Sequence, residues 1–331
     1  MHISSAFPTS LDSPDHIATA ERLGYTRAWL YDTPQQSPDV WMLLALAAER
    51  TERIGLGPGV LVPTLRHPMV NAAATAALTA LAPGRVAVAF GTGFSGARAM
   101  GAKPATWAFL RDYVRAFKGL LRGETVDWQG ARLRMLHPRA HAPARPIDVP
   151  VAISATGPKG LAVAHELGDG LFSVNGQTAA APEFPWAALA VHGTLLADGE
   201  PLDSPRVLAA AGPGNALAYH AIYEHNGDVG QLPGGERWLA TIHQADPRER
   251  HLAVHDQHLV TLNDADRAAW RAGSWAAIRD TTFTGTPTEL RPRLAALAAA
   301  GVTELIYQPT GPEIAGELEA FISVASEVTV P

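Results

Sequence analysis

The chain has 331 residues, of which 47% are hydrophobic and 18% are charged, so it can form a large core and lacks the composition of a disordered protein. Its formal charge of -6 comes without long lysine or arginine runs, so we expect a small-molecule partner and neither a nucleic acid nor a membrane surface. The absence of cysteine excludes disulfides, a thiolate nucleophile and cysteine-ligated metals, so any redox chemistry requires a bound cofactor. We find no leader pattern or long apolar stretch and expect a cytoplasmic protein.

Short β-branched or apolar runs alternate with alanine- and leucine-rich segments of helical spacing, which predicts repeated strand–helix units. In the first half we predict strands at 2–7, 27–31, 54–60 and 85–90, each followed by a helix, at 15–23, 40–50, 71–81 and 107–121. A short hairpin is predicted at 125–135, around a Gln129-Gly130 turn.

The second half continues the same alternation. We predict strands at 149–154, 170–174, 207–211 and 304–308 and helices at 160–167, 288–300 and 313–324. The histidine-rich stretch 213–275 is too long for one connection, and we interpret it as helices inserted at the seventh strand. Eight strands admit either a closed barrel or an open doubly wound sheet, and no linker composition indicates a second domain.

One strand-end loop has the features of a phosphate site. After the predicted strand 149–154 the sequence reads Ser154-Ala155-Thr156-Gly157-Pro158-Lys159 and then enters a helix. The free N–H groups and the positive dipole end of a helix start attract anions, and Ser154, Thr156 and Lys159 add donors. The alternative is an ordinary turn in which Thr156 caps the helix and Pro158 lies in its first turn.

Two other strand ends are rich in glycine. Gly91-Thr92-Gly93 opens a GxGxxG pattern, but a dinucleotide fold is disfavoured because the next predicted helix starts only near Trp107. The small residues of that loop would let a ligand approach the backbone closely, and the alternative is a flexible connection. The third strand ends in Gly57-Pro58-Gly59-Val60, which indicates a bulge or a ligand-facing backbone.

In their order and spacing, these loops resemble the luciferase-like family of flavin and deazaflavin oxidoreductases, and most closely its methylenetetrahydromethanopterin-reductase branch. The resemblance covers most of residues 1–174 and 285–331. It implies an α/β fold of the (β/α)₈ TIM-barrel type rather than an open sheet. With the helical insertion at strand 7 interpreted above, we expect residues 1–331 to form one domain. The resemblance also implies a homodimer.

The resemblance further implies a cofactor, either coenzyme F420 or FMN, at the mouth of the barrel. The segment from Thr156 through Gly157 and Pro158 to Lys159 would hold its phosphate. Gly59 and Val60 would form the family's non-prolyl cis peptide behind the ring. Asp32, Thr92 and Gly93 would line the pocket near the ring and ribityl chain.

Three functions follow from the resemblance. With F420 the reaction is hydride transfer between the ring and a small organic substrate. With reduced FMN the enzyme would be a monooxygenase that uses O₂ and a separate flavin reductase. The third alternative is a flavin-binding protein without catalysis. A glycoside hydrolase on the same barrel would need paired carboxylates, and Asp32 has no obvious partner.

Two departures from the family pattern argue against a sugar-phosphate dehydrogenase. Those members carry an acidic residue after Gly-Thr-Gly and a histidine after the second-strand aspartate. Here these places hold Phe94 and Thr33.

Thirteen histidines supply candidate acid–base residues. His67 follows the third strand and is predicted near the ring, with a helix-start residue as the alternative. The four-residue spacing of His220 and Glu224 places them on one face of a helix. Together with His258 they are the candidate acid–base residues of the inserted segment. The alternative is that this helix face is exposed and only polar. His251, His255 and His258 with Glu249 raise the question of a metal, but no HExxH pattern or other coherent ligand set is present, so we expect no metal site.

Overall fold

The computed structural model describes residues 1–138, 140–174 and 176–328. Within them, eight parallel strands are hydrogen-bonded in the order β3-β2-β1-β10-β9-β8-β7-β4. Parallel bridges from Leu56 to Val86 and from Leu61 to Phe90 close the ring between its two ends. The strands are β1 (His2–Phe7), β2 (Arg27–Leu30), β3 (Gly55–Pro58), β4 (Val88–Phe90), β7 (Val151–Ser154), β8 (Gly170–Val174), β9 (Ala187–His192) and β10 (Glu304–Gln308). The predicted (β/α)₈ barrel is confirmed.

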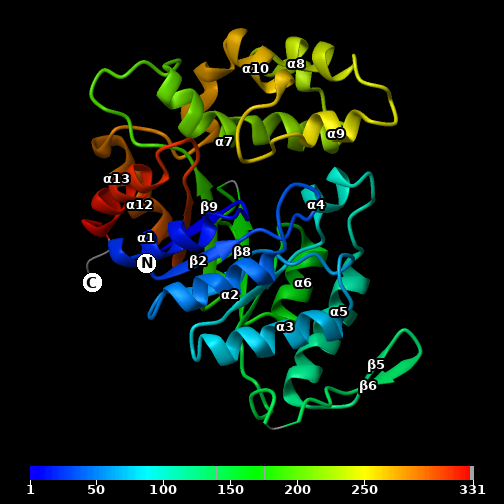
Figure 1. Ribbon diagram of the computed structural model, residues 1–331. Helices are drawn as coiled ribbons and strands as arrows, with labels where there is room; N and C mark the ends of the chain where they lie inside the picture. The colour runs from blue at the N-terminus through cyan, green and yellow to red at the C-terminus, as the bar shows by residue number, and fades with distance from the viewer. Residues whose placement is uncertain (139, 175, 329–331) are drawn as a thin grey trace.

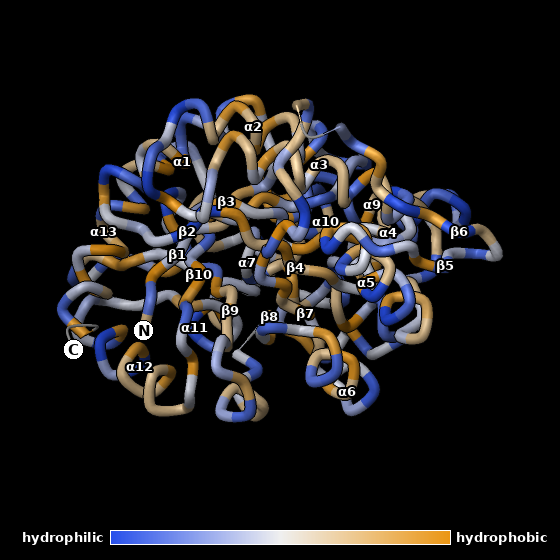
Figure 2. The backbone as a smooth tube through the Cα atoms, turned by 90° about the horizontal axis from the view of Figure 1, so that it is seen from below, coloured by the Kyte–Doolittle hydropathy of each residue, from blue (hydrophilic) through white to orange (hydrophobic). Residues whose placement is uncertain are grey.

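Helices surround this ring of strands (Figure 1; Figure 2). They are α1 (Ser13–Leu23), α2 (Val40–Arg50), α3 (Pro68–Leu81), α5 (Trp107–Arg122), α6 (Pro158–Leu167), α12 (Pro287–Ala299) and α13 (Ile314–Ser326). Side-chain caps fix the residues at which several of these helices begin. The Asp39 carboxylate accepts hydrogen bonds from the N–H groups of Trp41 and Met42 at the start of α2, and Thr286 forms a capping box with Glu289 at the start of α12. The helices predicted in these regions are confirmed with shifts of a few residues at their ends.

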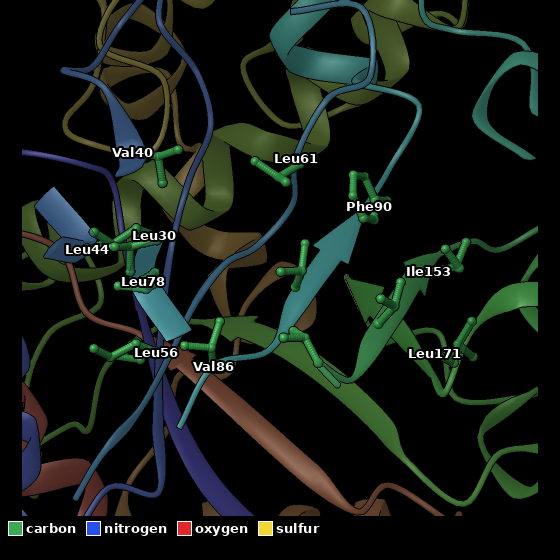
Figure 3. Close-up of a cluster of buried hydrophobic side chains, with 14 of the residues drawn as sticks. Leu30, Val40, Leu44, Leu56, Leu61, Leu78, Val86, Phe90, Ile153 and Leu171 are labelled. Carbon is green, nitrogen blue, oxygen red and sulfur yellow. The ribbon is translucent and has the colours of Figure 1, made fainter. Parts of the chain in front are cut away.

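The barrel interior is filled by two large aromatic residues and many alanines. Trp29 and Phe172 meet edge to face at 5.5 Å between ring centroids. The small residues that leave room for these rings are Ala6, Ala87, Ala89, Ala152, Ala188 and Ala190. A larger apolar layer lies between the strands and the outer helices; Figure 3 labels Leu30, Val40, Leu44, Leu56, Leu61, Leu78, Val86, Phe90, Ile153 and Leu171 in it. Alternation of small and large interior residues is how a small barrel is filled.

The predicted hairpin is confirmed as β5 (Val126–Trp128) paired antiparallel with β6 (Ala131–Leu133). Its two turn residues, Gln129 and Gly130, have φ of 48° and 82°, as a two-residue hairpin turn requires. Among the described residues, no helix combines the length and the apolar character needed to cross a membrane.

The predicted seventh strand at 207–211 is wrong. Those residues lie inside α7 (Pro205–Glu224), a helix that Ser204 caps, and the seventh strand is β9. Between β9 and α12 a layer of helices covers the upper end of the barrel (Figure 1). It contains α7, α8 (Gly235–Ile242), α9 (Arg250–His255), α10 (Asp264–Arg271) and α11 (Ile278–Thr281), with short 3₁₀ turns η2 (Val229–Gln231) and η3 (Ser274–Ala277). The turn η1 (Ala181–Glu183) precedes β9.

Candidate functional site

A cavity of about 280 Å³ lies where the carboxyl ends of the strands meet the inserted helices. This is the end of a (β/α)₈ barrel at which ligands bind. Its barrel side is formed by strand-end residues, including Asp32 after β2, Val60 after β3, Gly91 after β4, Ser154 of β7 and His192 of β9. Its roof comes from α7 and from residues 255–259, so the barrel and the insertion together enclose the cavity.

Backbone rather than side chains forms one wall of the cavity. The peptide bond between Gly59 and Val60 is cis, as the resemblance predicted. A Cβ atom added to Gly91 would lie 2.8 Å from Cγ2 of Val60, and one added to Gly93, whose φ is 79°, would lie 2.3 Å from Cγ1 of Val62. These positions therefore require glycine, which lets a ligand approach the backbone closely.

Asp32 is a buried carboxylate held by one arginine. Nη1 of Arg66 donates to both Asp32 oxygens, at 2.6 and 2.7 Å, and Nη2 donates to Asp39 at 2.7 Å. Burial raises the pKa of Asp32, while the hydrogen bonds and charge of Arg66 act in the opposite direction. The backbone carbonyl of Arg66 accepts a hydrogen bond from Tyr113 at 2.8 Å, which fixes the loop that carries the arginine.

A chain of buried polar groups forms part of the roof. Nε2 of His220 is 3.0 Å from Oδ1 of Asp266, and the same oxygen accepts the indole N–H of Trp238 at 2.8 Å. Nδ1 of His220 shares a 2.7 Å hydrogen bond with Nδ1 of His258. Since Asp266 is an acceptor, a neutral His220 carries its proton on Nε2 and accepts a hydrogen bond at Nδ1 from the N–H on Nδ1 of His258.

A second chain of polar groups, partly buried, joins the roof to α4 (Phe94–Ala99). Glu224 accepts from Arg98 at 2.7 Å and lies 3.0 Å from Nε2 of His255. The roof is also hydrogen-bonded to the barrel mouth: Gln36 donates to the carbonyl of His255, and Gln308 donates to the carbonyl of Leu259 at 3.1 Å.

Three imidazole nitrogens on the cavity wall have no hydrogen-bond partner among the described residues: Nδ1 of His192, Nδ1 of His255 and Nε2 of His258. Burial lowers the pKa of His192 to about 4. Burial and the neighbouring imidazoles also hold the pKa of His258 well below its usual value. Both rings are therefore neutral near pH 7 and present a lone pair or an N–H to a ligand.

The structure brings most of the predicted site residues to this cavity. Those that line it are Asp32, Gly59, Val60, Thr92, Gly93, Ser154, His220, Glu224 and His258. Thr156, Gly157, Pro158 and Lys159 are exposed at the start of α6, beyond Ser154. Gly157 is the N-cap residue of α6 and Thr156 makes no cap hydrogen bond, so the capped-turn alternative is wrong in that detail.

The structure does not bring His67 to the cavity. Its side chain is exposed, and Nδ1 accepts the N–H of Met69 at 3.2 Å at the start of α3. The ring lies edge-on to Trp128, with 6.1 Å between ring centroids. These contacts match the alternative of a helix-start residue, because a capping nitrogen is already engaged with the backbone.

Several residues that line the cavity are not predicted from the sequence. His192 was missed because its strand was not predicted, although a histidine at the carboxyl end of a barrel strand is a recognisable signal. The flexible-connection alternative for the loop after β4 is wrong for residues 94–99, which form α4 directly after Gly93. The prediction that the next helix starts only near Trp107 is wrong for the same reason. His255 was noted only for its spacing to neighbouring histidines, which indicates nothing about its contact with Glu224.

Comparison with known proteins adds an independent line of evidence. The family model for luciferase-like monooxygenases matches residues 12–304. The F420-dependent glucose-6-phosphate dehydrogenase of Intrasporangium calvum is 35% identical over 180 residues, which are 49% of this chain and 53% of that protein. The chain thus spans about half the length of this relative. The 5,10-methylenetetrahydromethanopterin reductase of Archaeoglobus fulgidus is 26% identical over 317 residues, 90% of each chain.

Solved structures share the fold. The coenzyme F420-dependent tetrahydromethanopterin reductase of Methanopyrus kandleri aligns over 99% of both chains with a TM-score of 0.69 and 19% identity. An F420-dependent secondary alcohol dehydrogenase aligns over 100% of both chains with a TM-score of 0.65 and 17% identity. Because the family model matches most of the chain, the resemblance drawn from its loops is confirmed: this chain belongs to the luciferase-like monooxygenase family.

Proposed function

We propose that this protein is an oxidoreductase that uses coenzyme F420 for hydride transfer to or from a small organic substrate. The observation that carries the proposal is the glycine-walled cavity at the strand ends. The relative from Intrasporangium calvum supports F420 over FMN, because it is named as an F420-dependent enzyme.

The residues of the cavity fit a flat, largely apolar ring. Gly91 and Gly93 have no room for a side chain, and the adjoining wall is formed by Val60, Phe172 and Ala190. Such a pocket, apolar with a few placed polar groups, is typical of cofactor sites. When bound, F420 supplies a two-electron hydride donor or acceptor.

We assign the cofactor phosphate to the start of α6. No side chain caps this ten-residue helix, Pro158 has no N–H, and the N–H of Gly160 is bonded to the carbonyl of Gly157 at 3.0 Å. The anion would therefore meet the backbone N–H of Lys159, the positive charge of the Lys159 side chain and the positive end of the helix dipole. Asp32 and Thr92 would then line the path between the ring and the phosphate, and Ser154 lies where the cavity meets the loop that leads to α6.

The roof residues His220, Glu224 and His258 are the candidates for contact with the substrate, because they face the barrel wall across the cavity. Arg66 and Arg98 are both engaged with carboxylates, and no lysine of the described residues lines the cavity. Phe94 and Thr33 also stand where sugar-phosphate dehydrogenases of the family carry an acid and a histidine. We therefore propose an uncharged substrate rather than a sugar phosphate.

A parallel titration of cofactor-free protein with F420 and with FMN tests the proposal. We expect saturable F420 binding, followed by the absorbance and fluorescence of the deazaflavin, and FMN binding at least about tenfold weaker, a difference of about 1.4 kcal/mol. Selective FMN binding would instead support a monooxygenase supplied by a flavin reductase. Binding of neither cofactor would contradict every flavin-dependent function considered for this chain.

We also propose that residues 1–331 act as one domain, because the barrel and the insertion share the cavity. In addition, we propose that two copies of the chain form a homodimer. The outer faces of α2 and α3 expose apolar side chains, among them Met42, which is 68% exposed, with Leu46, Val70 and Leu81. Exposed apolar faces of this kind are typical of subunit interfaces, and a two-fold dimer would bury the same face of both copies. Analytical ultracentrifugation should give a dimer that Leu46→Glu dissociates; a monomeric wild-type protein would contradict this.

A further inference from the structure

Three buried histidines converge in the roof of the cavity. They are His220 of α7, His255 at the end of α9 and His258 in the turn that follows, and all three line the cavity. One ring nitrogen of each lies within 4.8 Å of a ring nitrogen of each of the others. His258 is held there by an unusual turn, since Gln257 and Leu259 on either side of it have φ of 56° and 63°. Left-handed backbone at residues other than glycine persists where surrounding structure enforces it, often at ligand sites.

The outer nitrogens of two of these rings are bound to carboxylates. Nε2 of His220 is 3.0 Å from Asp266, and Nε2 of His255 is 3.0 Å from Glu224. With Nε2 protonated toward a carboxylate, a neutral imidazole keeps its lone pair on Nδ1, on the opposite side of the ring. Pairs of this kind, with a carboxylate behind a histidine, orient the histidine ligands of protein metal sites.

The charge of the cluster also favours a bound cation. Asp266 is buried, and its partners are His220, the indole N–H of Trp238 and the N–H of Asn263; among the described residues no lysine or arginine pairs with it. A buried carboxylate without a cationic partner is costly.

From these contacts we propose that His220, His255 and His258 bind a divalent transition-metal ion of the Zn²⁺ type. Imidazole nitrogens suit this class of ion, and three protein ligands leave a fourth position open. That position faces the cavity, where the ion would hold an oxygen atom of the substrate. In the metal-free protein the proton on Nδ1 of His258 is shared with Nδ1 of His220; the ion takes its place, and that proton moves to Nε2 of His258.

The geometry needs only a modest adjustment. Three nitrogens that lie about 2.0 Å from one tetrahedral ion are about 3.3 Å from each other. The present cluster, with a closest pair at 2.7 Å and all pairs within 4.8 Å, reaches this arrangement by small side-chain rotations. The sequence predicts no metal site, because it contains neither an HExxH pattern nor another coherent ligand set. Here two ligands come from residues 255–258 and the third from α7.

The test is a titration of chelator-treated protein with ZnCl₂ and CoCl₂, without any flavin. We expect one ion per chain, and visible Co²⁺ absorption bands that indicate a four-coordinate site in the wild-type protein. His258→Ala should bind Zn²⁺ at least about 100-fold more weakly, and Asp266→Asn about 10- to 100-fold more weakly. His243→Ala, which removes an exposed histidine of the same insertion, should bind like the wild type.

Two results would overturn the assignment. One is the absence of stoichiometric Zn²⁺ or Co²⁺ binding by the folded wild-type protein, and the other is equal Zn²⁺ affinity in folded His258→Ala and His243→Ala. The Co²⁺ spectrum of the wild type does not depend on how well any variant folds. Because no cofactor is present in this experiment, its outcome is separate from that of the F420 titration.

Discussion

Replacement of Arg66 by alanine is expected to lower the free energy of unfolding by about 3 kcal/mol, since the loss of one partner from a buried ion pair typically costs 3–5 kcal/mol. Asp32, whose side chain is 1% exposed, would remain as a buried carboxylate without its two charged hydrogen bonds. Chemical denaturation monitored by circular dichroism at pH 7 measures the change.

The matched control is Arg50→Ala, which removes an arginine from an exposed pair with Asp15 and should change the free energy of unfolding by less than about 1 kcal/mol.

The pH dependence of the Arg66→Ala effect gives a second check. Without Arg66, burial raises the pKa of Asp32 further, and a group with a raised pKa in the folded state loses its stabilising contribution as pH rises. The cost of Arg66→Ala should therefore shrink in acid; equal costs for both variants, or a cost that grows in acid, would contradict the assignment.

Gly91→Ala is expected to weaken F420 binding by about 30-fold, or about 2 kcal/mol, the usual cost of an extra methyl group in a packed site. The new Cβ would lie 2.8 Å from Cγ2 of Val60, and the displaced valine would enter the space assigned to the ring. Titration of the variant with F420 measures the loss, and thermal unfolding shows whether the protein remains folded.

Gly316→Ala provides the control for that substitution. A Cβ at Gly316, on α13, meets nothing within 4 Å, so this variant should bind F420 normally and unfold at or above the wild-type temperature. Wild-type affinity in folded Gly91→Ala would show that the ring lies elsewhere.

Most of the fold could be predicted because its strands are short apolar runs followed by segments of helical spacing. β8 and β10 have the predicted bounds, and so does α2. β9 was missed because its sequence, Ala187-Ala188-Leu189-Ala190-Val191-His192, is rich in alanine and has the composition of a helix. Tertiary packing decides the outcome, since Ala188 and Ala190 fit beside Trp29 and Phe172 inside the barrel.

The barrel side of the site was predictable for the same reason. The carboxyl ends of parallel strands must meet in a barrel, which directed attention to the strand-end loops that contain Gly59, Thr92 and Ser154. The family resemblance then assigned Asp32, Gly59 and Thr92 to the cofactor pocket. His67 also follows a strand, but local hydrogen bonding to the start of α3 holds it at the surface.

The roof was harder to predict. His220 and His258 are 38 residues apart, and their contact depends on how α7 packs against the segment after α9. Helical spacing indicated that His220 and Glu224 share a face, but it contains no information on the partners Asp266 and His255. Such contacts are set by the tertiary packing of the insertion and not by any local pattern.

The most direct test of the proposed F420 site is a crystal structure of the protein with bound F420. We predict electron density for the deazaflavin ring in van der Waals contact with Gly59, Val60 and Gly91, and for the phosphate at the N-terminus of α6 beside Lys159. A ring bound outside this cavity, or a cavity without density under conditions where F420 saturates the protein in solution, would contradict the proposed site.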